Sequence, residues 1–193
     1  CCSLFFDYRY NNNEIDKIYG NYRSDDYANS RSEFESGYKE LNDKMLNDAT
    51  EVKNRKKNLS GLIQKLIPDI DSIETVLDYG GDKGQYIPDD FKNAKRFLYD
   101  ISDSQPQDNV IREESIEGKL YDFIMICHTL EHVNYPMELI KSISKNLTEN
   151  GYLYIELPFD IPMKAMFSFA LKQERLMENL SVGMHEHINF FTT

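Results

Sequence analysis

The sequence predicts an α/β protein with a doubly wound, mostly parallel sheet, and three observations support this prediction. Apolar runs typical of buried strands recur after residue 70, separated by segments with helical spacing. The first run ends at Asp78 and leads at once into the glycine-rich turn YGGDKG, the kind of turn where such sheets bind a ligand. Prolines and turn residues mark the boundaries of the elements in between.

Composition limits the class of protein. The chain has 193 residues, of which 40% are hydrophobic and 28% charged, and this suits a globular protein with one core and an appendage. Its formal net charge of −11 would repel a phosphate backbone, so we expect no nucleic-acid partner. No apolar run approaches the roughly 20 residues of a membrane span, and no signal peptide is recognisable. The three cysteines form no disulfide framework, which favours a cytoplasmic location.

The chain divides into three predicted parts. Residues 1–32 are irregular and aromatic, and we expect them to form an N-terminal arm. Residues 33–68 carry an apolar stripe at helical spacing and form a helical cap segment, with the basic cluster 53–57 on its solvated face. Residues 69–193 form the sheet domain. In the alternative interpretation the arm is a lid over the ligand, formed by Tyr22, Arg23 and Tyr27.

Four strands and three helices are expected in the sheet domain. The strands are predicted at 75–79, 96–101, 121–127 and 152–157. The helices are predicted at 86–94, 136–147 and 162–180. Pro136 suits a first helical turn, and the strands alternate only weakly between polar and apolar residues. That weak alternation is typical of a parallel sheet covered on both faces, with Cys127 as a small core residue.

Acidic residues at the strand ends mark the predicted ligand site. Because the carboxyl ends of parallel strands meet at one edge of the sheet, Asp78 and Asp100 are expected beside the same crevice. A carboxylate after the second strand can accept hydrogen bonds from both hydroxyls of a ribose. Gly80, Gly81 and Gly84 would let the backbone approach the ligand closely.

Four segments, in this order, resemble the class I S-adenosylmethionine-dependent methyltransferases: VLDYGGDKG, FLYDIS, YDFIMICHTLEHV and NGYLYIELP. The resemblance covers about residues 73–158 and implies a Rossmann-like fold with S-adenosylmethionine as cofactor. The residues that it assigns to the cofactor are Asp78, Gly80, Gly81 and Gly84 for the amino-acid end, Asp100 for the ribose, and His128 and Thr129 for the methionine side and the methyl donor. It also implies an adenine contact within 112–116. Asp82 replaces a glycine of the family loop, which would lower the affinity for the cofactor.

The segment MHEHINFF, Met184–Phe191, contains the candidate catalytic residues and allows three interpretations. A metal site is not expected, because the sequence shows no partner cluster for these histidines. A structural role would place His187 beneath the following phenylalanines. We favour the third interpretation, in which His187 is a general base assisted by Glu186.

A narrower resemblance concerns the substrate. Glu186 and His187 followed by an aromatic pair are similar to a segment of bacterial methyltransferases that act on deoxysugars and surface polysaccharides. This implies a small, sugar-like acceptor. Met184 stands where the carbon-methylating members have a tyrosine, so methylation at oxygen and at carbon both remain open.

Two other functions stay open at this point. One is an NAD-dependent oxidoreductase, although the loop lacks the Gly-x-Gly-x-x-Gly spacing of that class. The other is a non-catalytic binding module with a degenerate methyltransferase fold. The fold usually has two more strands, so we expect either that they lie beyond Thr193 and this domain is incomplete at its C-terminal side, or that a second copy covers the sheet edge in a homodimer.

Overall fold

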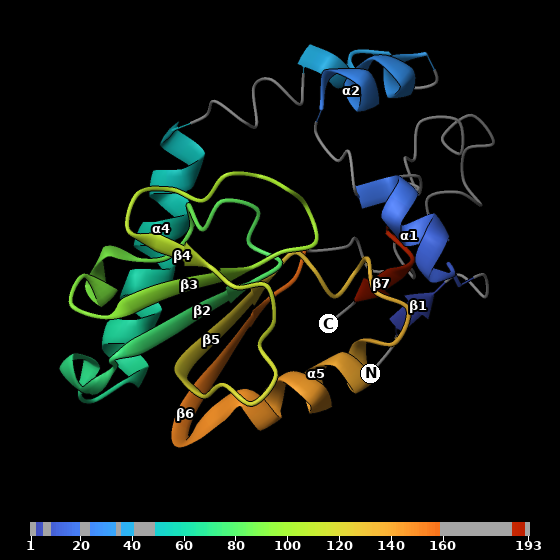
Figure 1. The fold of residues 1–193 in the computed structure, drawn as a ribbon. Helices are drawn as coiled ribbons and strands as arrows, with labels where there is room; N and C mark the ends of the chain where they lie inside the picture. Colours follow the sequence, from blue (N-terminus) through green and yellow to red (C-terminus); the bar gives the residue numbers. More distant parts are fainter. Residues whose placement is uncertain are drawn as a thin grey trace, which may run out of the picture.

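A five-stranded parallel sheet forms the centre of the protein (Figure 1). The computed structural model describes residues 3–5, 9–19, 24–33, 36–40, 49–158 and 187–191. The strands lie in the order β4-β3-β2-β5-β6, and all neighbouring pairs are parallel. Their bounds are β2 Thr75–Tyr79, β3 Lys95–Tyr99, β4 Val110–Arg112, β5 Tyr121–Cys127 and β6 Leu147–Glu156. The chain runs outward from β2 on one side and returns to β5 on the other, which creates a switch point between these two strands.

Helices and a small second sheet surround this centre (Figure 1). The helices are α1 Asn12–Tyr19, α2 Asp25–Ser32, α4 Ala49–Leu66 and α5 Pro136–Ile143, and short 3₁₀ turns lie at Ile70–Ser72, Asp89–Phe91 and Ser144–Asn146. β1, Ser3–Phe5, pairs antiparallel with β7, Asn189–Phe191. The first and last described segments of the chain therefore lie side by side. No helix in the described ranges is long and apolar enough to cross a membrane.

The predicted α/β class is confirmed, and so are several of its elements. β2 and β5 have the predicted bounds, and β3 and α5 differ from the predictions only at their ends. β6 begins five residues earlier than expected, at Leu147, and the short edge strand β4 was not among the predicted strands. The helix expected at 162–180 lies outside the described residues, and the division of the chain at residues 32 and 68 stays a prediction.

The helix predicted at 86–94 is wrong, because only the 3₁₀ turn at Asp89–Phe91 forms there. Pro88 adopts an extended conformation with ψ of 150° in front of this turn. A proline disfavours helical geometry at the residue before it, so Ile87 cannot continue a helix from the glycine loop. The non-helical path still buries the side chains of Ile87 and Phe91 against the sheet.

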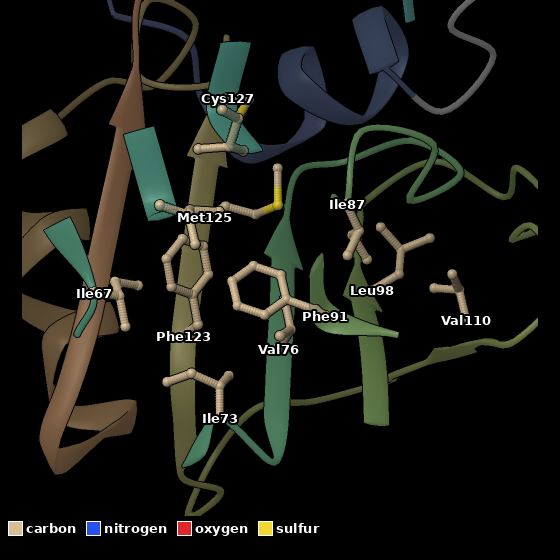
Figure 2. Packing of buried hydrophobic residues seen from close by; sticks show 12 residues of the cluster. Ile67, Ile73, Val76, Ile87, Phe91, Leu98, Val110, Phe123, Met125 and Cys127 are labelled. Atoms are coloured by element: carbon tan, nitrogen blue, oxygen red, sulfur yellow. The ribbon is translucent and has the colours of Figure 1, made fainter. Parts of the chain in front are cut away.

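The hydrophobic core lies on both faces of the sheet. On one face, shown in Figure 2, Phe123, Met125 and Cys127 of β5 belong to a cluster that also contains Leu59 and Ile63 of α4. The alternate residues of β5 point to the opposite face. That second cluster consists of Leu77, Tyr121, Ile124, Ile126, Leu130 and Ile143. Cover on both faces explains why the strands read as apolar runs, and it confirms Cys127 as a core residue.

The N-terminal arm contacts the segment that follows β5. The Tyr10 N–H donates to Asn134 Oδ1 at 3.1 Å, and Asn134 Nδ2 donates to the Tyr10 carbonyl at 2.6 Å. The Tyr19 ring packs edge-on against His132 at 5.8 Å. Of the expected lid residues, Tyr22 and Arg23 lie outside the described ranges. Tyr27 contacts Tyr38 and accepts a hydrogen bond from Arg31.

Truncation of one core side chain should show how α4 is held to the sheet. Ile63 is 3% exposed in the cluster beneath α4, whereas Leu62, next to it in the same helix, is 41% exposed. We expect Ile63→Ala to lower the free energy of unfolding by about 2–4 kcal/mol, because the lost side chain leaves a cavity. Leu62→Ala, as matched control, should lower it by about 0.5 kcal/mol or less. Urea denaturation measures both values, and equal losses would show that α4 does not pack through this face.

Candidate active site

The loop after β2 turns tightly around the end of the strand. Gly80 and Gly84 both have a φ of +73°, and the Gly80 N–H donates to the Tyr99 carbonyl of β3 at 2.7 Å. A Cβ at Gly81 would overlap the carboxylate of Asp78. A Cβ at Gly80 would lie 2.5 Å from the Thr129 hydroxyl. Gly80 and Gly84 are thus required by backbone conformation, and Gly81 by its close contact with Asp78.

Asp78 is an unusual carboxylate because it is fully buried at the carboxyl end of β2. Its side chain is 0% exposed, and neither oxygen has a hydrogen-bond partner within the described ranges. Burial, together with the nearby charges of Asp100 and Asp82, raises the pKa of Asp78 to about 7, and Arg55 offsets part of this effect. Ionisation of Asp78 therefore needs a cation or a hydrogen-bond donor at this position.

Asp100, just after β3, holds the glycine loop in place. Its Oδ2 accepts a hydrogen bond from the Asp82 N–H at 2.8 Å, and its Oδ1 accepts one from the Ser102 N–H at 2.7 Å. Asp82 has a φ of +55°, a left-handed conformation that aspartate tolerates better than most residues. The glycine that is missing from the expected loop pattern therefore does not prevent the turn. Asp78 and Asp100 lie close enough to influence each other's charge, as the sequence predicted.

His128 lies between two carboxylates at the end of β5. Its Nε2 is 3.0 Å from Glu156 Oε1, and its Nδ1 is 3.5 Å from Glu131 Oε1. Interaction with Glu131 and Glu156 raises the pKa of His128 to about 9. His128 also has a φ of +52°, a conformation that is uncommon outside glycine. At neutral pH, His128 is a cation that offsets part of the acidic charge at this edge of the sheet.

Thr129 connects the ends of β5 and β2. Its hydroxyl donates to the Cys127 carbonyl at 3.2 Å and lies 3.4 Å from the Tyr79 carbonyl. Its side chain is the group that approaches Gly80. Thr129 therefore sits directly beside the glycine loop, and its expected place at the methyl donor stays a prediction.

Arg55 is a site residue that the sequence analysis missed. Its Nη2 lies 2.8 Å from Glu156 Oε1, and its guanidinium lies 3.8 Å above the Tyr86 ring. The expectation of a solvated face for the cluster 53–57 is wrong at Arg55, which is half-buried, although Lys53 is exposed. The helical spacing of Arg55 from Leu59 and Ile63 could have identified it, because residues four apart share a face.

Glu156 is the second missed residue, and it connects several groups of the site. Besides Arg55 and His128, it binds Tyr154, whose hydroxyl donates to Oε2 at 2.8 Å. Its hydrogen bond with His128 contributes most to lowering its pKa to about 2. Its position at the carboxyl end of β6 was a usable signal, because the other strand-end acids converge on the same edge.

The segment 112–116 also approaches the loop after β3. Arg112 donates hydrogen bonds from its guanidinium to the carbonyls of Asp100 and Ser104, each at 2.9 Å, and to that of Ser102. These bonds brace the loop that follows Asp100. The adenine contact expected within this segment stays a prediction.

The segment around His187 is fixed to the residues that follow β5. The N–H groups of Ile188 and Asn189 donate to the Glu131 carbonyl at 2.8 and 3.0 Å. Asn189 Nδ2 donates to the carbonyls of Leu130 and Val133 at 3.0 and 2.7 Å. These bonds bring the His187 ring to 4.7 Å from that of His132. Glu186, the expected partner of His187, lies outside the described residues.

The charges of this edge suit a positively charged ligand. Its carboxylates are those of Asp78, Asp100, Glu131 and Glu156, and the cations that contact them are Arg55 and His128. An excess of partly buried acid attracts and holds cations. The arrangement therefore favours a ligand with a cationic group that can reach Asp78.

The pH dependence of stability should reveal the burial of Asp78. The pKa is about 7 in the folded protein and about 3.9 in an unfolded chain. The folded state therefore binds the proton more tightly, and its stabilising effect, complete below pH 4, is lost as the pH rises through 7. Asp78→Asn removes this titration, so we expect its stability relative to the wild type to rise by about 2–4 kcal/mol between pH 4 and pH 8.

Urea denaturation at a series of pH values measures this difference. Asp103→Asn, at an exposed neighbouring position, is the control and should follow the wild-type profile. Parallel profiles for Asp78→Asn and the wild type would show that Asp78 is not buried as an acid of raised pKa.

Comparison with known proteins identifies the family. The family described as "Methyltransferase domain" matches residues 52–193. The comparison with curated proteins found no match.

Among solved structures, the plantazolicin methyltransferase BpumL is 17% identical to this chain. It was solved in complex with a pentazolic desmethylPZN analog and SAH, and its TM-score is 0.52 over 83% of this chain and 67% of that chain. Coclaurine N-methyltransferase, bound to N-methylheliamine and SAH, is 20% identical, with a TM-score of 0.44 over 52% of this chain. Streptomyces venezuelae DesVI is 12% identical, with a TM-score of 0.47 over 60% of this chain and 54% of that chain.

These likenesses bear on the fold. This chain spans 35% of coclaurine N-methyltransferase and 67% of BpumL. The similarity to BpumL confirms the Rossmann-like fold that the sequence predicted. The SAH in the BpumL complex, S-adenosylhomocysteine, is what S-adenosylmethionine becomes after it gives up its methyl group. The family model matches well over half of this chain, so the chain belongs to the methyltransferase domain family.

Proposed function

We propose that this protein transfers a methyl group from S-adenosylmethionine to a small, sugar-like molecule. The observation that carries the proposal is the buried carboxylate of Asp78, which has no hydrogen-bond donor within the described ranges and lies under the glycine loop. S-adenosylmethionine carries a cationic sulfonium and a cationic amino group, either of which compensates such a charge. Membership of the methyltransferase domain family supports the same conclusion.

The residues present fit the cofactor in two respects. A buried acid without a donor needs a cation, and the loop at Gly80 and Gly81 has no room for side chains because the backbone lies against Thr129 and Asp78. We assign Asp78, Gly80, Gly81 and Gly84 to the amino-acid end of the cofactor. This assignment rests on position at the carboxyl end of β2, next to the switch point of the sheet.

We assign three further residues to the rest of the cofactor. We assign Asp100 to the ribose hydroxyls. Each of its carboxylate oxygens accepts one hydrogen bond from the backbone and has a second lone pair that can accept another. His128 and Thr129 line the side of the methyl group. His128 is positively charged, and Glu131 and Glu156 contact it and offset that charge.

The protein's task in this reaction is alignment, exclusion of water and removal of one proton. When bound, the cofactor supplies a methyl group that is already activated. The acceptor must lose a proton whether it is methylated at a hydroxyl oxygen or at a carbon beside a keto group. We assign this proton to His187 as general base, assisted by Glu186. His187 is held near the end of β5, next to His132, which supports this assignment.

Binding measurements with a modified ligand should test the role of Asp100. We expect Asp100→Ala to weaken the binding of S-adenosylhomocysteine at least tenfold, because both ribose hydroxyls lose their acceptor. Isothermal titration calorimetry measures the affinity. Asp103→Ala, at an exposed position in the same loop, is the matched control and should bind as the wild type does.

The 2′,3′-dideoxy analogue of S-adenosylhomocysteine separates ribose binding from support of the loop. If Asp100 binds the hydroxyls, the wild type should lose affinity for the analogue, and Asp100→Ala should bind both ligands equally. An additional loss for the analogue in Asp100→Ala would assign Asp100 to the loop alone.

Turnover should depend on His187. With a panel of nucleotide sugars and radiolabelled S-adenosylmethionine, we expect wild-type transfer to a sugar and a loss of about 10²–10⁴-fold in His187→Ala. Affinity for S-adenosylhomocysteine should stay within about twofold, because His187 is not assigned to the cofactor. His185→Ala, at the other histidine of the motif, is the control. Unchanged turnover in His187→Ala would refute the base, and absence of any sugar product would refute the proposed acceptor.

A further inference from the structure

Glu131 is a second buried acid, and it follows β5, whereas the glycine loop follows β2. Its side chain is 1% exposed, and neither carboxylate oxygen has a hydrogen-bond partner in the part of the chain that is described. The nearest nitrogens are His128 Nδ1 at 3.5 Å and His132 Nε2 at 3.8 Å from Oε1. A buried carboxylate is costly unless a donor or a cation compensates it. His128 offsets part of the charge of Glu131, so a further cation at this carboxylate would share it with His128.

Two imidazole rings converge on this carboxylate. One nitrogen each of His132 and His187 and one oxygen of Glu131 all lie within 4.8 Å of one another. The two rings stand nearly perpendicular, at 76°, with their centroids 4.7 Å apart. The backbone bonds from Ile188 and Asn189 to the Glu131 carbonyl hold the His187 segment at this distance. The convergence is therefore supported by backbone hydrogen bonds between the two segments.

We propose that Glu131, His132 and His187 bind one divalent transition-metal ion of the zinc class. Two imidazoles and a carboxylate form a ligand set that zinc uses, and Fe²⁺, Co²⁺ and Ni²⁺ accept similar ligands. In a tetrahedral zinc site, ligand atoms lie about 3.4 Å apart, given metal–ligand lengths of about 2.0–2.2 Å. The distance of 3.8 Å between Glu131 Oε1 and His132 Nε2 is already close to this, and side-chain rotations that shorten the distances to His187, now within 4.8 Å, would complete the set.

The structure brings further ligands to the histidine motif. In the sequence alone, the histidines of Met184–Phe191 have no partner cluster. The fold brings Glu131 and His132 to His187 from the segment after β5, more than 50 residues away in the chain. Three protein ligands leave a fourth position open for water or for an oxygen of another molecule.

Metal binding has a consequence for the proposed reaction, and only this consequence rests on the proposed function. A nitrogen of His187 that coordinates a metal ion cannot accept a proton. A bound zinc ion therefore blocks the general base, and zinc should inhibit methyl transfer while a chelator restores it. The binding itself involves neither S-adenosylmethionine nor the acceptor, so it can be measured separately.

Calorimetry with zinc tests the site directly. The full chain, freed of metal with a chelator, is titrated with ZnCl₂, and we expect one equivalent to bind. His132→Ala and Glu131→Gln should each weaken this binding at least tenfold, because each removes one ligand. Glu138→Gln, an exposed acid on α5, is the matched control and should bind zinc as the wild type does. Co²⁺ as a second probe should give visible absorption bands that His132→Ala abolishes.

The outcomes separate this inference from the proposed function. Absence of stoichiometric zinc binding, or equal binding in the wild type and His132→Ala, would overturn the metal site. His132 is partly exposed, so its variant is expected to fold, and circular dichroism checks this. A wild type that binds zinc but not S-adenosylhomocysteine would refute the proposed function and leave the metal site standing.

Discussion

The hydrogen bonds that tie the glycine loop to β3 are the constraint on which the site depends. The Gly80 N–H binds the Tyr99 carbonyl, and Asp100 binds the N–H of Asp82. Together these hydrogen bonds hold the loop against the end of β2, and Asp78 beneath it has no contact with solvent. Burial then raises the pKa of Asp78 and leaves its charge to be compensated by something outside the described residues. A backbone arrangement thus produces a binding preference for cations, because it removes water from a carboxylate that cannot find another donor.

Charge balance explains why cationic side chains lie among the acids at this edge of the sheet. Parallel strands converge at their carboxyl ends, and four of the segments there contribute an acid, so like charges are crowded in a poorly solvated region. Arg55 reaches in from α4 and His128 from the end of β5, and both bind Glu156. Neither reaches Asp78 closely enough to form an ion pair with it in the described structure. The edge is therefore neutralised on the β6 side and left acidic on the β2 side, where the loop would hold its ligand.

The sequence predicts the elements whose local pattern is strong, and two of its wrong predictions gave too little weight to another local signal. β2 and β5 are predictable because apolar runs that end in an acid or a histidine are characteristic of buried parallel strands. The convergence of Asp78 and Asp100 follows from the same rule. The helix predicted at 86–94 does not form, because Pro88 disfavours helical geometry at Ile87 and the helical pattern there is weak. The prediction for Arg55 was wrong because a basic cluster usually marks a solvent-exposed helix face. The spacing of Arg55 from Leu59 places it on the buried face instead.

The surroundings of His187 show why a local motif could not describe its own site. β7 pairs with β1, and Asn189 binds Leu130 and Val133, so the motif is held by residues from the beginning and the middle of the chain. α1 adds Tyr19 against His132. None of these partners has a sequence spacing that predicts the contact. They hold a ring nitrogen of His187 within 4.8 Å of a carboxylate oxygen of Glu131. Proton transfer and metal binding thus compete for one nitrogen, and the same backbone bonds that support the first also make the second possible.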